Sequence, residues 1–432
     1  MKALLLLLLA CTSTLLVSLP LRAQELEAKP DDPAFAKFQP LKAPRPGKLL
    51  LEKGDRLAIC GDSITEQKMY SRAMETYLTV CVPELEVTVR QYGWGGETAP
   101  GFLARITNDC LRFKPTIATT CYGMNDHRYG AYRPEIGDTY RKASTQIVRA
   151  FKAAGARVVH GSPGCVGLNK NWDAESVEVK NLNLVTLRNL GIELAAQEQV
   201  AFADVFWPML QAGVEGRKRY GPGYAIAGKD GVHPDWAGSF VMAYAFLKGL
   251  GLGGEIGTLT VNLANHTATA SAGHRILSAK PGELTLESAK YPFCVSGDPA
   301  RDNNIRSATT LVPFHEELNR FQLVGTGGTG RYKVTWGTES KSFSAEQLAR
   351  GINLAQEFEK TPFAEAFARV DAAVARKQDY ETRQIKTLFH GPEAALDLPA
   401  VAELTEKTRA PLALAIRKAF TPVTHTLSIT AE

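Results

Sequence analysis

The sequence predicts an α/β fold with a parallel sheet over residues 48–257, then an antiparallel β module over 258–343 and a mainly helical region over 344–432. Three observations predict it. Short apolar, β-branched runs alternate with amphipathic helical stretches up to about residue 250, which favours right-handed βαβ units. After the Gly-rich stretch 251–257, short alternating runs are separated by turn residues, as is typical of antiparallel strands. Finally, 44% hydrophobic and 22% charged residues match an ordinary globular protein and exclude disorder, collagen and coiled coil.

In the first domain, the expected strands cover 56–60, 85–91, 116–122, 156–161 and 200–204. The expected helices cover 66–80, 99–112, 138–154, 181–198 and 234–250. In such a parallel sheet the ligand cleft lies beyond the carboxyl ends of the strands. Residues following those ends are therefore the ones to examine for function.

In the β module, the expected strands cover 257–263, 267–272, 283–286, 320–324 and 332–336. Between the last two lies 325–330, which matches the spacing of a dinucleotide-binding fingerprint. Because strands flank it and no helix follows to hold a pyrophosphate, it is interpreted as a hairpin loop. The helical region is interrupted by prolines, and 424–430 is a candidate last strand.

The first 23 residues resemble a secretory signal, with Lys2, an apolar stretch and Ala23 before a polar sequence. We expect cleavage after Ala23 and a periplasmic or extracellular location, with lipid anchoring at Cys11 as a minor alternative. A Pro-rich extended leader is expected over 24–47. No later stretch is long and apolar enough to cross a bilayer.

Six cysteines follow the signal, too few for a disulfide framework in a chain of this size, and their spacing does not reveal pairing. Cys60 and Cys121, at the ends of two expected neighbouring strands, are the pair to inspect first. The net charge of +5 is small and dispersed, which argues against a nucleic-acid partner.

Four polar segments follow expected strand ends or precede the last helix of the α/β domain: 60–65, 92–98, 122–127 and 230–234. Loops at one sheet edge converge, so we expect one site to contain Ser63, Gly96, Asn125, Asp230 and His233. In this hypothesis Ser63 is the nucleophile, His233 the general base and Asp230 the residue that orients the imidazole. The backbone N–H groups of Ser63 and Gly96 and the Asn125 amide are the expected oxyanion donors.

These segments resemble the SGNH (GDSL-type) hydrolase superfamily: Gly61-Asp62-Ser63-Ile64, Gly96 in its glycine block, Gly123-Met124-Asn125-Asp126 and Asp230-Gly231-Val232-His233-Pro234. Each block alone is weak, but four in the right order are specific. The resemblance covers about 50–250. It implies a flavodoxin-like three-layer α/β/α domain with strand order 2-1-3-4-5, no metal or other cofactor, and hydrolysis of esters or thioesters. Ile64 stands where the family usually has Leu.

Structural roles compete with these catalytic ones. Ser63 would also suit a helix N-cap, with Glu66 completing a capping box. Asn125 could close a turn, and His233 could be a surface histidine before a helix. Asp62 is interpreted as structural, and His127 is left open between substrate contact and a turn.

The resulting hypothesis is an exported serine esterase that removes small acyl groups, such as acetyl, from a carbohydrate. Its partner would be a small-molecule or polysaccharide ester. A lipid esterase or a thioesterase is the alternative enzyme, and a non-catalytic glycan-binding protein is the alternative of another class. The acyl group, the oligomeric state and the role of 258–432 do not follow from the sequence.

Overall fold

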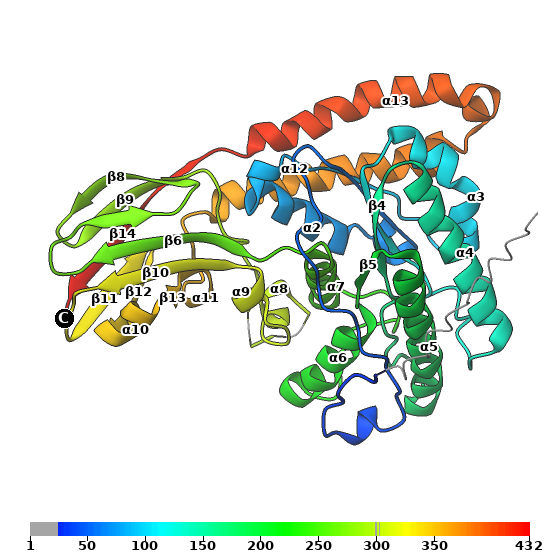
Figure 1. The fold of residues 1–432 in the computed structure, drawn as a ribbon, viewed down its shortest axis with the longest axis horizontal. Coiled ribbons are helices and arrows are strands. Elements are labelled where there is room, and N and C mark those ends of the chain that lie inside the picture. The colour runs from blue at the N-terminus through cyan, green and yellow to red at the C-terminus, as the bar shows by residue number, and fades with distance from the viewer. Residues whose placement is uncertain (1–24, 299, 302) are drawn as a thin grey trace, which may run out of the picture.

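The computed structural model describes residues 25–298, 300–301 and 303–432. An α/β domain occupies one end, two packed β sheets occupy the other, and two long helices run between them (Figure 1). The expected signal sequence, its cleavage site and Cys11 lie outside the described residues. In the described part, no helix combines the length and the hydrophobicity needed to cross a membrane.

The α/β domain is built on a five-stranded parallel sheet in the order β2-β1-β3-β4-β5, which confirms the order that the resemblance implies. Its strands are β1 (Arg56–Gly61), β2 (Thr88–Gln91), β3 (Ile117–Cys121), β4 (Arg157–Gly161) and β5 (Ala201–Ala203). Gly61 pairs with Cys121, and Cys121 with Gly161, so the three central strands end at the same level. The loops that follow them therefore meet at one edge.

Helices cover both faces of this sheet. Successive residues of a strand point to opposite faces, so each strand contributes to two cores. Ile59 packs with the core around α2 and α7, whereas Ala58 and Cys60 pack with the core around α3 and α4. The helices and short turns are η1 (Pro33–Phe35), α1 (Ser63–Glu66), α2 (Met69–Val80), η2 (Pro83–Leu85), α3 (Ala99–Asp109), η3 (Leu111–Phe113), α4 (Pro134–Ala153), α5 (Ala174–Glu198), α6 (Phe206–Tyr220) and α7 (Trp236–Gly249). The three-layer prediction is thereby confirmed.

Three details differ from the prediction. The helix expected over 66–80 is two helices, because Lys68 adopts a left-handed backbone (φ 60°) between α1 and α2. Helix α6 was not predicted. The leader packs rather than running free: Phe35 and Phe38 are buried, with their ring centroids 5.4 and 6.2 Å from that of Trp207 on α6.

The β module consists of two sheets, in the orders β13-β10-β6-β7 and β12-β11-β14-β9-β8. Their strands are β6 (Glu255–Asn262), β7 (Ala268–Ala270), β8 (His274–Lys280), β9 (Glu283–Ser288), β10 (Arg320–Thr326), β11 (Arg331–Trp336), β12 (Glu339–Ser344), β13 (Ile352–Asn353) and β14 (Val423–Ala431), with α8 (Ile305–Ala308) and α9 (Phe314–Glu317) between β9 and β10. The pairing is antiparallel except between β6 and β10, which run parallel. The 325–330 loop joins β10 to β11 in the other sheet, so it is not a hairpin loop; a strand follows it.

The last strand returns to the middle of the five-stranded sheet, where β14 pairs with both β9 and β11. The helical part is thus an excursion from the β module rather than a region appended after it, unlike the predicted succession of 258–343 and 344–432. It contains α10 (Ala345–Arg350), α11 (Leu354–Glu357), α12 (Ala364–Arg383), the π-helical turn η4 (Gln384–Leu388) and α13 (Pro392–Ala419). Helix α13 is interrupted by a kink at Asp397, two residues before Pro399. The Asp397 carboxylate accepts a hydrogen bond from Ala400 N at 2.9 Å and so caps the second part of the helix.

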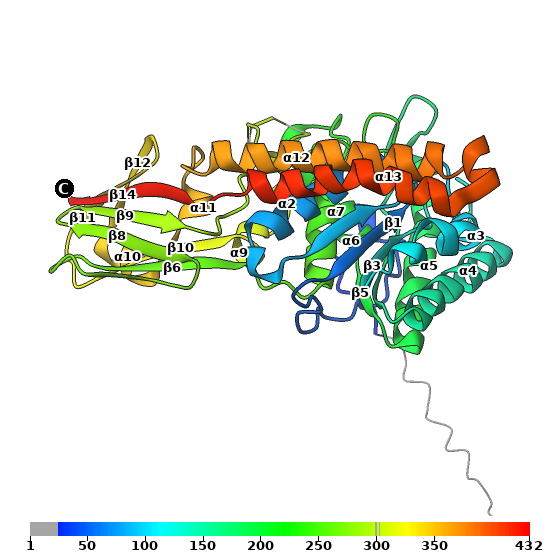
Figure 2. The same cartoon turned by 90° about the horizontal axis from the view of Figure 1, so that it is seen from above.

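Helices α12 and α13 lie side by side over the β2 edge of the parallel sheet (Figure 2). Val89 O accepts hydrogen bonds from Lys377 Nζ at 2.5 Å and Arg409 Nη2 at 3.0 Å, and Gln91 N donates to Glu381 Oε2 at 3.2 Å. An open sheet edge exposes unpaired backbone groups, and here side chains of the C-terminal helices bind them. The α/β domain and the helical excursion are therefore one packed unit.

Buried charges hold this contact together. Lys377, 1% exposed, lies 2.8 Å from Glu75 and 3.1 Å from Glu381, and Arg409 also pairs with Glu381. Burial opposes ionisation of Glu381, but the charges of Lys377 and Arg409 outweigh it and hold its pKa below the usual value. Removing one member would leave an unpaired buried charge, which typically costs about 3–5 kcal/mol.

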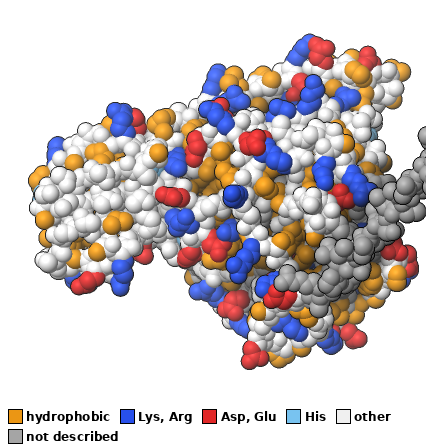
Figure 3. All heavy atoms as spheres, in the orientation of Figure 1, with side chains coloured by type: hydrophobic (Ala, Val, Ile, Leu, Met, Phe, Trp, Pro, Cys, Tyr) orange, Lys and Arg blue, Asp and Glu red, His pale blue; other side chains and the backbone are white. Residues whose placement is uncertain are grey.

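All six cysteines in the described residues are free thiols, so Cys60 and Cys121 form no disulfide. On the face in Figure 3, cationic and anionic side chains intermingle over the α/β domain and its covering helices, whereas the β module carries few charges.

Candidate active site

The structure brings Ser63, His233 and Asp230 into one hydrogen-bonded chain. His233 Nε2 lies 2.8 Å from Ser63 Oγ, and His233 Nδ1 lies 2.7 Å from Asp230 Oδ2. Ser63 begins α1 just after β1. Asp230 and His233 lie in the loop before α7, and His233 is 170 positions from Ser63. The chain runs in the order hydroxyl, imidazole, carboxylate that nucleophilic catalysis requires.

The loop that carries Asp230 and His233 is held by hydrogen bonds within the loop and by Asn169, whose Nδ2 donates to Asp230 O at 2.6 Å. Asp230 Oδ1 accepts hydrogen bonds from Val232 N at 2.9 Å and His233 N at 2.8 Å. Partial burial works against the ionised carboxylate, but the His233 backbone and imidazole bonds outweigh it and lower the pKa of Asp230. A charged Asp230 favours the tautomer of His233 that carries its proton on Nδ1 and leaves Nε2 free to accept one.

Ser63 is presented by a short turn whose cap is Asp62, not Ser63. Asp62 Oδ1 accepts from Ile64 N at 3.0 Å, which places Asp62 in the structural role expected for it. Burial raises the pKa of Asp62 to about 7. The capping box expected between Ser63 and Glu66 does not form, because the Glu66 carboxylate accepts instead from Gly95 N and binds Lys386.

Gly96 lies in the glycine loop, which we define as residues 92–98. Its φ of +74° is readily adopted only by glycine, whereas a Cβ there would have no neighbour within 4 Å. The backbone conformation, rather than crowding by the protein, therefore explains this glycine. Gly93 is constrained differently: a Cβ would lie 2.1 Å from Glu66 N, so the loop packs directly on the turn that carries the serine.

Asn125 joins the same cluster through both ends of its amide. Asn125 Nδ2 donates to Glu97 O at 3.0 Å in the glycine loop, and Asn125 Oδ1 accepts from Tyr129 Oη at 2.8 Å. Arg128 and Tyr129 both have left-handed backbones, with φ of 56° and 54°. Burial raises the pKa of Tyr129 to about 12, so its hydroxyl remains a donor at neutral pH.

The Arg105 side chain holds both ends of the glycine loop, in part through a buried ion pair. Arg105 on α3 binds Glu97 through Nε–Oε1 and Nη2–Oε2 contacts of 2.6 Å each, and Arg105 Nη2 also donates to Tyr92 O at 2.8 Å. This bidentate geometry is the strongest form of the arginine–carboxylate contact. The loop is therefore clamped at both of its ends by one side chain.

The other sequence candidates have structural positions. Asp126 accepts from Ala99 N and Gly123 N, so it caps the start of α3. His127 is fully buried, with Nδ1 next to Met124 O and its ring centroid 4.7 Å from that of Tyr129. Burial lowers the pKa of His127 to about 4, so the ring is neutral at physiological pH. Of the two roles left open for His127, the structure therefore favours the local one.

Sequence reasoning missed the residues that support the site, namely Glu66, Glu97, Arg105, Tyr129 and Lys386. Glu97 lay within the segment 92–98, and Glu66 was named only as half of a capping box, so neither showed its partner. The partners of Glu66 and Glu97 come from other elements, and only the fold brings them together.

The described part of the chain contains no cluster of three or more His, Cys, Asp or Glu side chains suited to a metal ion.

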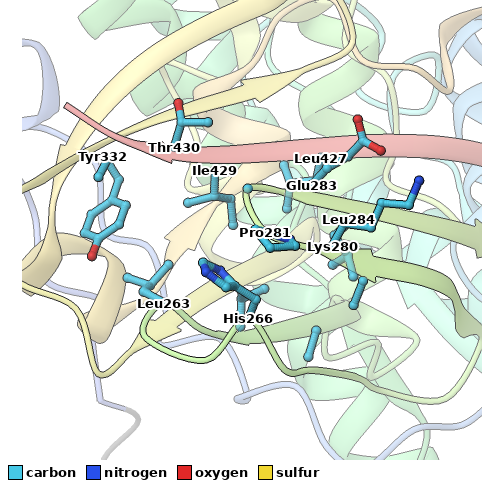
Figure 4. A pocket seen from close by; sticks show the side chains of 15 residues that line it. Leu263, His266, Lys280, Pro281, Glu283, Leu284, Tyr332, Leu427, Ile429 and Thr430 are labelled. Atoms are coloured by element: carbon cyan, nitrogen blue, oxygen red, sulfur yellow. The ribbon is translucent and has the colours of Figure 1, made fainter.

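A separate cavity of about 320 Å³ opens between the two sheets of the β module (Figure 4). Its walls are mainly aliphatic, with Leu263, Leu427 and Ile429 facing Pro281 and Tyr332.

Comparison with known proteins finds a family match within the α/β domain. Residues 59–239 match the GDSL-like lipase/acylhydrolase family. No curated protein matches the chain. Among solved structures, it is similar to BT4096, described as a gut microbial diltiazem-metabolizing enzyme, with 23% identity and a TM-score of 0.72 over 90% of this chain and 100% of that one. That likeness extends the shared fold beyond the α/β domain.

Two further similar structures cover about half of this chain. Axe2, an acetylxylan esterase from Geobacillus stearothermophilus, is 21% identical, with a TM-score of 0.40 over 47% of this chain and 97% of that one. A GDSL-like lipase from Parabacteroides merdae is 19% identical, with a TM-score of 0.40 over 48% and 99%.

The fold and the family match define the class of this protein as a hydrolase acting on ester bonds. Its α/β domain belongs to the GDSL-like lipase/acylhydrolase family of the SGNH hydrolase superfamily.

Proposed function

We propose that the protein is an exported serine esterase that removes small acyl groups, acetyl foremost, from carbohydrate esters. Ser63 is the nucleophile, His233 the general base and Asp230 the carboxylate that orients His233. The single observation that carries this proposal is the continuous chain from Ser63 Oγ through both ring nitrogens of His233 to Asp230.

The geometry supports a two-step acyl transfer. Ser63 Oγ attacks the ester carbonyl carbon while His233 Nε2 takes the hydroxyl proton, and the carbonyl oxygen becomes an oxyanion. Ser63 N, Gly96 N and Asn125 Nδ2 are the proposed donors to that oxyanion. Collapse expels the alcohol, which receives the proton from His233, and leaves an acyl group on Ser63. Water, deprotonated by His233, then attacks the acyl-enzyme and releases the acid.

The carbohydrate part of the proposal draws on an aromatic pair beside Asn125. Tyr129 binds the Asn125 side chain, and its ring centroid lies 5.8 Å from that of Trp172, a half-buried residue. An aromatic face at this position is suited to packing against the apolar face of a sugar ring. Trp172→Ala should therefore raise KM for an acetylated oligosaccharide but leave KM for p-nitrophenyl acetate unchanged.

Ser63→Ala tests the esterase proposal. Full-length wild type and variant are compared on p-nitrophenyl acetate, butyrate and octanoate, an acyl thioester and an acetylated polysaccharide. Turnover of acetate esters that disappears in Ser63→Ala supports the proposal. Preference for octanoate or for the thioester would favour the lipid esterase or thioesterase alternative. Silence on all substrates, together with measurable glycan binding, would favour the glycan-binding alternative.

Export is tested separately. Expression in a bacterial host, followed by N-terminal sequencing of the protein recovered outside the cytoplasm, should give Gln24 as the first residue. Recovery of the uncleaved chain from the cytoplasm would contradict it.

A further inference from the structure

The helical excursion reaches the glycine loop and its neighbour Glu66 through Lys386 and His390, next to the proposed oxyanion donor. Lys386 Nζ lies 2.7 and 2.9 Å from the two carboxylate oxygens of Glu66. The same carboxylate accepts the N–H of Gly95, the residue before Gly96. Glu66 itself lies three positions after Ser63, so one carboxylate connects the serine turn, the glycine loop and the C-terminal helices.

Lys386 is held in place by the turn that carries it. Gln384, at the start of η4, accepts from Arg90 Nη1 at 2.9 Å and donates to Thr405 Oγ1 and Glu406 Oε1 at 2.8 Å each. The turn is π-helical, an irregularity often found at functional sites. Lys386 thus extends from a fixed element rather than from a free surface loop.

A second contact from the same segment supports the assignment. The His390 ring meets Trp94 of the glycine loop edge to face, with centroids 4.8 Å apart, and His390 Nε2 lies 2.9 Å from Asp109 Oδ2. A Cβ added to Gly95 would lie 3.5 Å from Lys386 Nζ. Segment 384–390 therefore lies directly against the glycine loop.

The negative charge of Glu66 lies close to the proposed oxyanion donors. A carboxylate bonded to the N–H of Gly95 is one residue from a donor that must stabilise a developing negative charge at Gly96. Uncompensated, it would oppose that charge, because electrostatic interactions are strong in a site that excludes water. Glu66 is 23% exposed and Lys386 36% exposed, so solvent screens the pair only in part.

We propose that Lys386 is a positioning residue for the oxyanion hole: it neutralises and fixes Glu66, so that Glu66 can hold the glycine loop without opposing the oxyanion. The helical excursion thereby completes the active site of the α/β domain. This inference rests on the proposed serine esterase function.

The test is a double-mutant cycle in the full-length protein with p-nitrophenyl acetate. Lys386→Met should lower kcat about tenfold, equivalent to about 1.4 kcal/mol of barrier, and leave KM within about twofold, because the charge matters in the transition state. Glu66→Gln keeps an acceptor for Gly95 N without the charge. Adding it to Lys386→Met should restore kcat to within about threefold of Glu66→Gln alone. Lys386→Arg should keep most of the activity.

Asp371→Asn is the matched control. Asp371 on α12 pairs with Arg72 on α2, so it joins the same helices to the same domain without touching Glu66 or the glycine loop. It should lower the unfolding temperature but not kcat. If Lys386→Met does not fold, Lys386→Gln replaces it in the cycle.

The outcomes separate the two proposals. If wild type is active and Ser63→Ala is inactive, but Lys386→Met has wild-type kcat or the double variant is no better than Lys386→Met, the role of Lys386 is refuted and the esterase stands. If Ser63→Ala keeps wild-type activity, the proposed function itself fails.

Discussion

The Ser63–His233–Asp230 half of the site and the glycine-loop half are held in different ways. Asp230 accepts a backbone N–H from three positions away and Asp62 caps α1 through Ile64 N, so most contacts of the first half are local. One longer contact is added by Asn169, whose Nδ2 donates to Asp230 O at 2.6 Å. The glycine loop depends on Arg105 from α3 and, through Glu66, on Lys386, 320 positions from Glu66. The residues of the first half lie in short loops, so short sequence motifs reveal them. The glycine-loop half is held by residues distant in sequence, so it depends on the stability of the whole fold.

The largest expected effect falls on the first half alone. His233→Ala removes the base and should lower kcat/KM by about 10⁴-fold or more, as in other triads. Because the His233 side chain hydrogen-bonds, within the described residues, to Ser63 and Asp230 and is 32% exposed, the unfolding temperature should change little. Initial-rate kinetics and thermal unfolding of the same sample check both. A large loss of stability would break the comparison.

The second half should lose activity and stability together. Arg105→Met leaves the buried Glu97 carboxylate without its bidentate partner, which should cost about 3–5 kcal/mol of unfolding free energy. Loosening the loop should also lower kcat by about 10²-fold, the size of effect of losing one oxyanion donor. Urea unfolding and kinetics measure the two losses, with Glu97→Gln/Arg105→Met as the control that lacks the Glu97 charge. Asp109, the second partner of Arg105 at 3.3 Å, keeps its contact with His390 in both variants. Normal kcat in a destabilised variant would show that the pair is structural only.

A smaller effect is expected at Tyr129. Tyr129→Phe keeps the ring against Trp172 but removes the hydroxyl that binds Asn125 Oδ1. The amide would then be oriented only by Glu97 O, and kcat should fall about tenfold with unchanged KM, equivalent to about 1.4 kcal/mol. Equal kcat in wild type and variant would remove Tyr129 from the supports of the site.

The last prediction concerns the pH dependence of the fold rather than the activity of the site. Burial lowers the pKa of His160 from 6.5 to about 4. Since the unfolded chain then binds the proton more readily, stability should fall as pH drops below about 6.5 and level off near 4, by about 3 kcal/mol for this imidazole. His160→Gln should flatten that slope in urea unfolding between pH 7 and 4.5. An unchanged slope would contradict the assignment.

The sequence was sufficient for the α/β architecture because alternating strands and helices leave few topologies. It also selected the five residues that the structure brings to one edge, although their catalytic roles remain predictions. It could not show that β14 completes the β module or that α12 and α13 cover the β2 edge. Those arrangements depend on pairings between Val89 and Arg409, or Glu66 and Lys386, about 320 positions apart, and no local pattern encodes them.

The glycine at position 96 illustrates a further limit. Its backbone N–H was expected to be an oxyanion donor, and the structure explains why the residue is a glycine by its left-handed backbone, with φ of +74°. The sequence motif identified the position of this glycine, but only its φ angle explains why a glycine is needed there.

The most direct measurement of the central assignment is covalent labelling of the serine. Full-length protein is treated with a fluorophosphonate, digested and analysed by peptide mass spectrometry, with His233→Ala in parallel. We predict one phosphonyl adduct, on Ser63, formed in step with the loss of p-nitrophenyl acetate hydrolysis and much more slowly in His233→Ala. Inactivation with the adduct on another residue, or full activity with Ser63 labelled, would contradict the account.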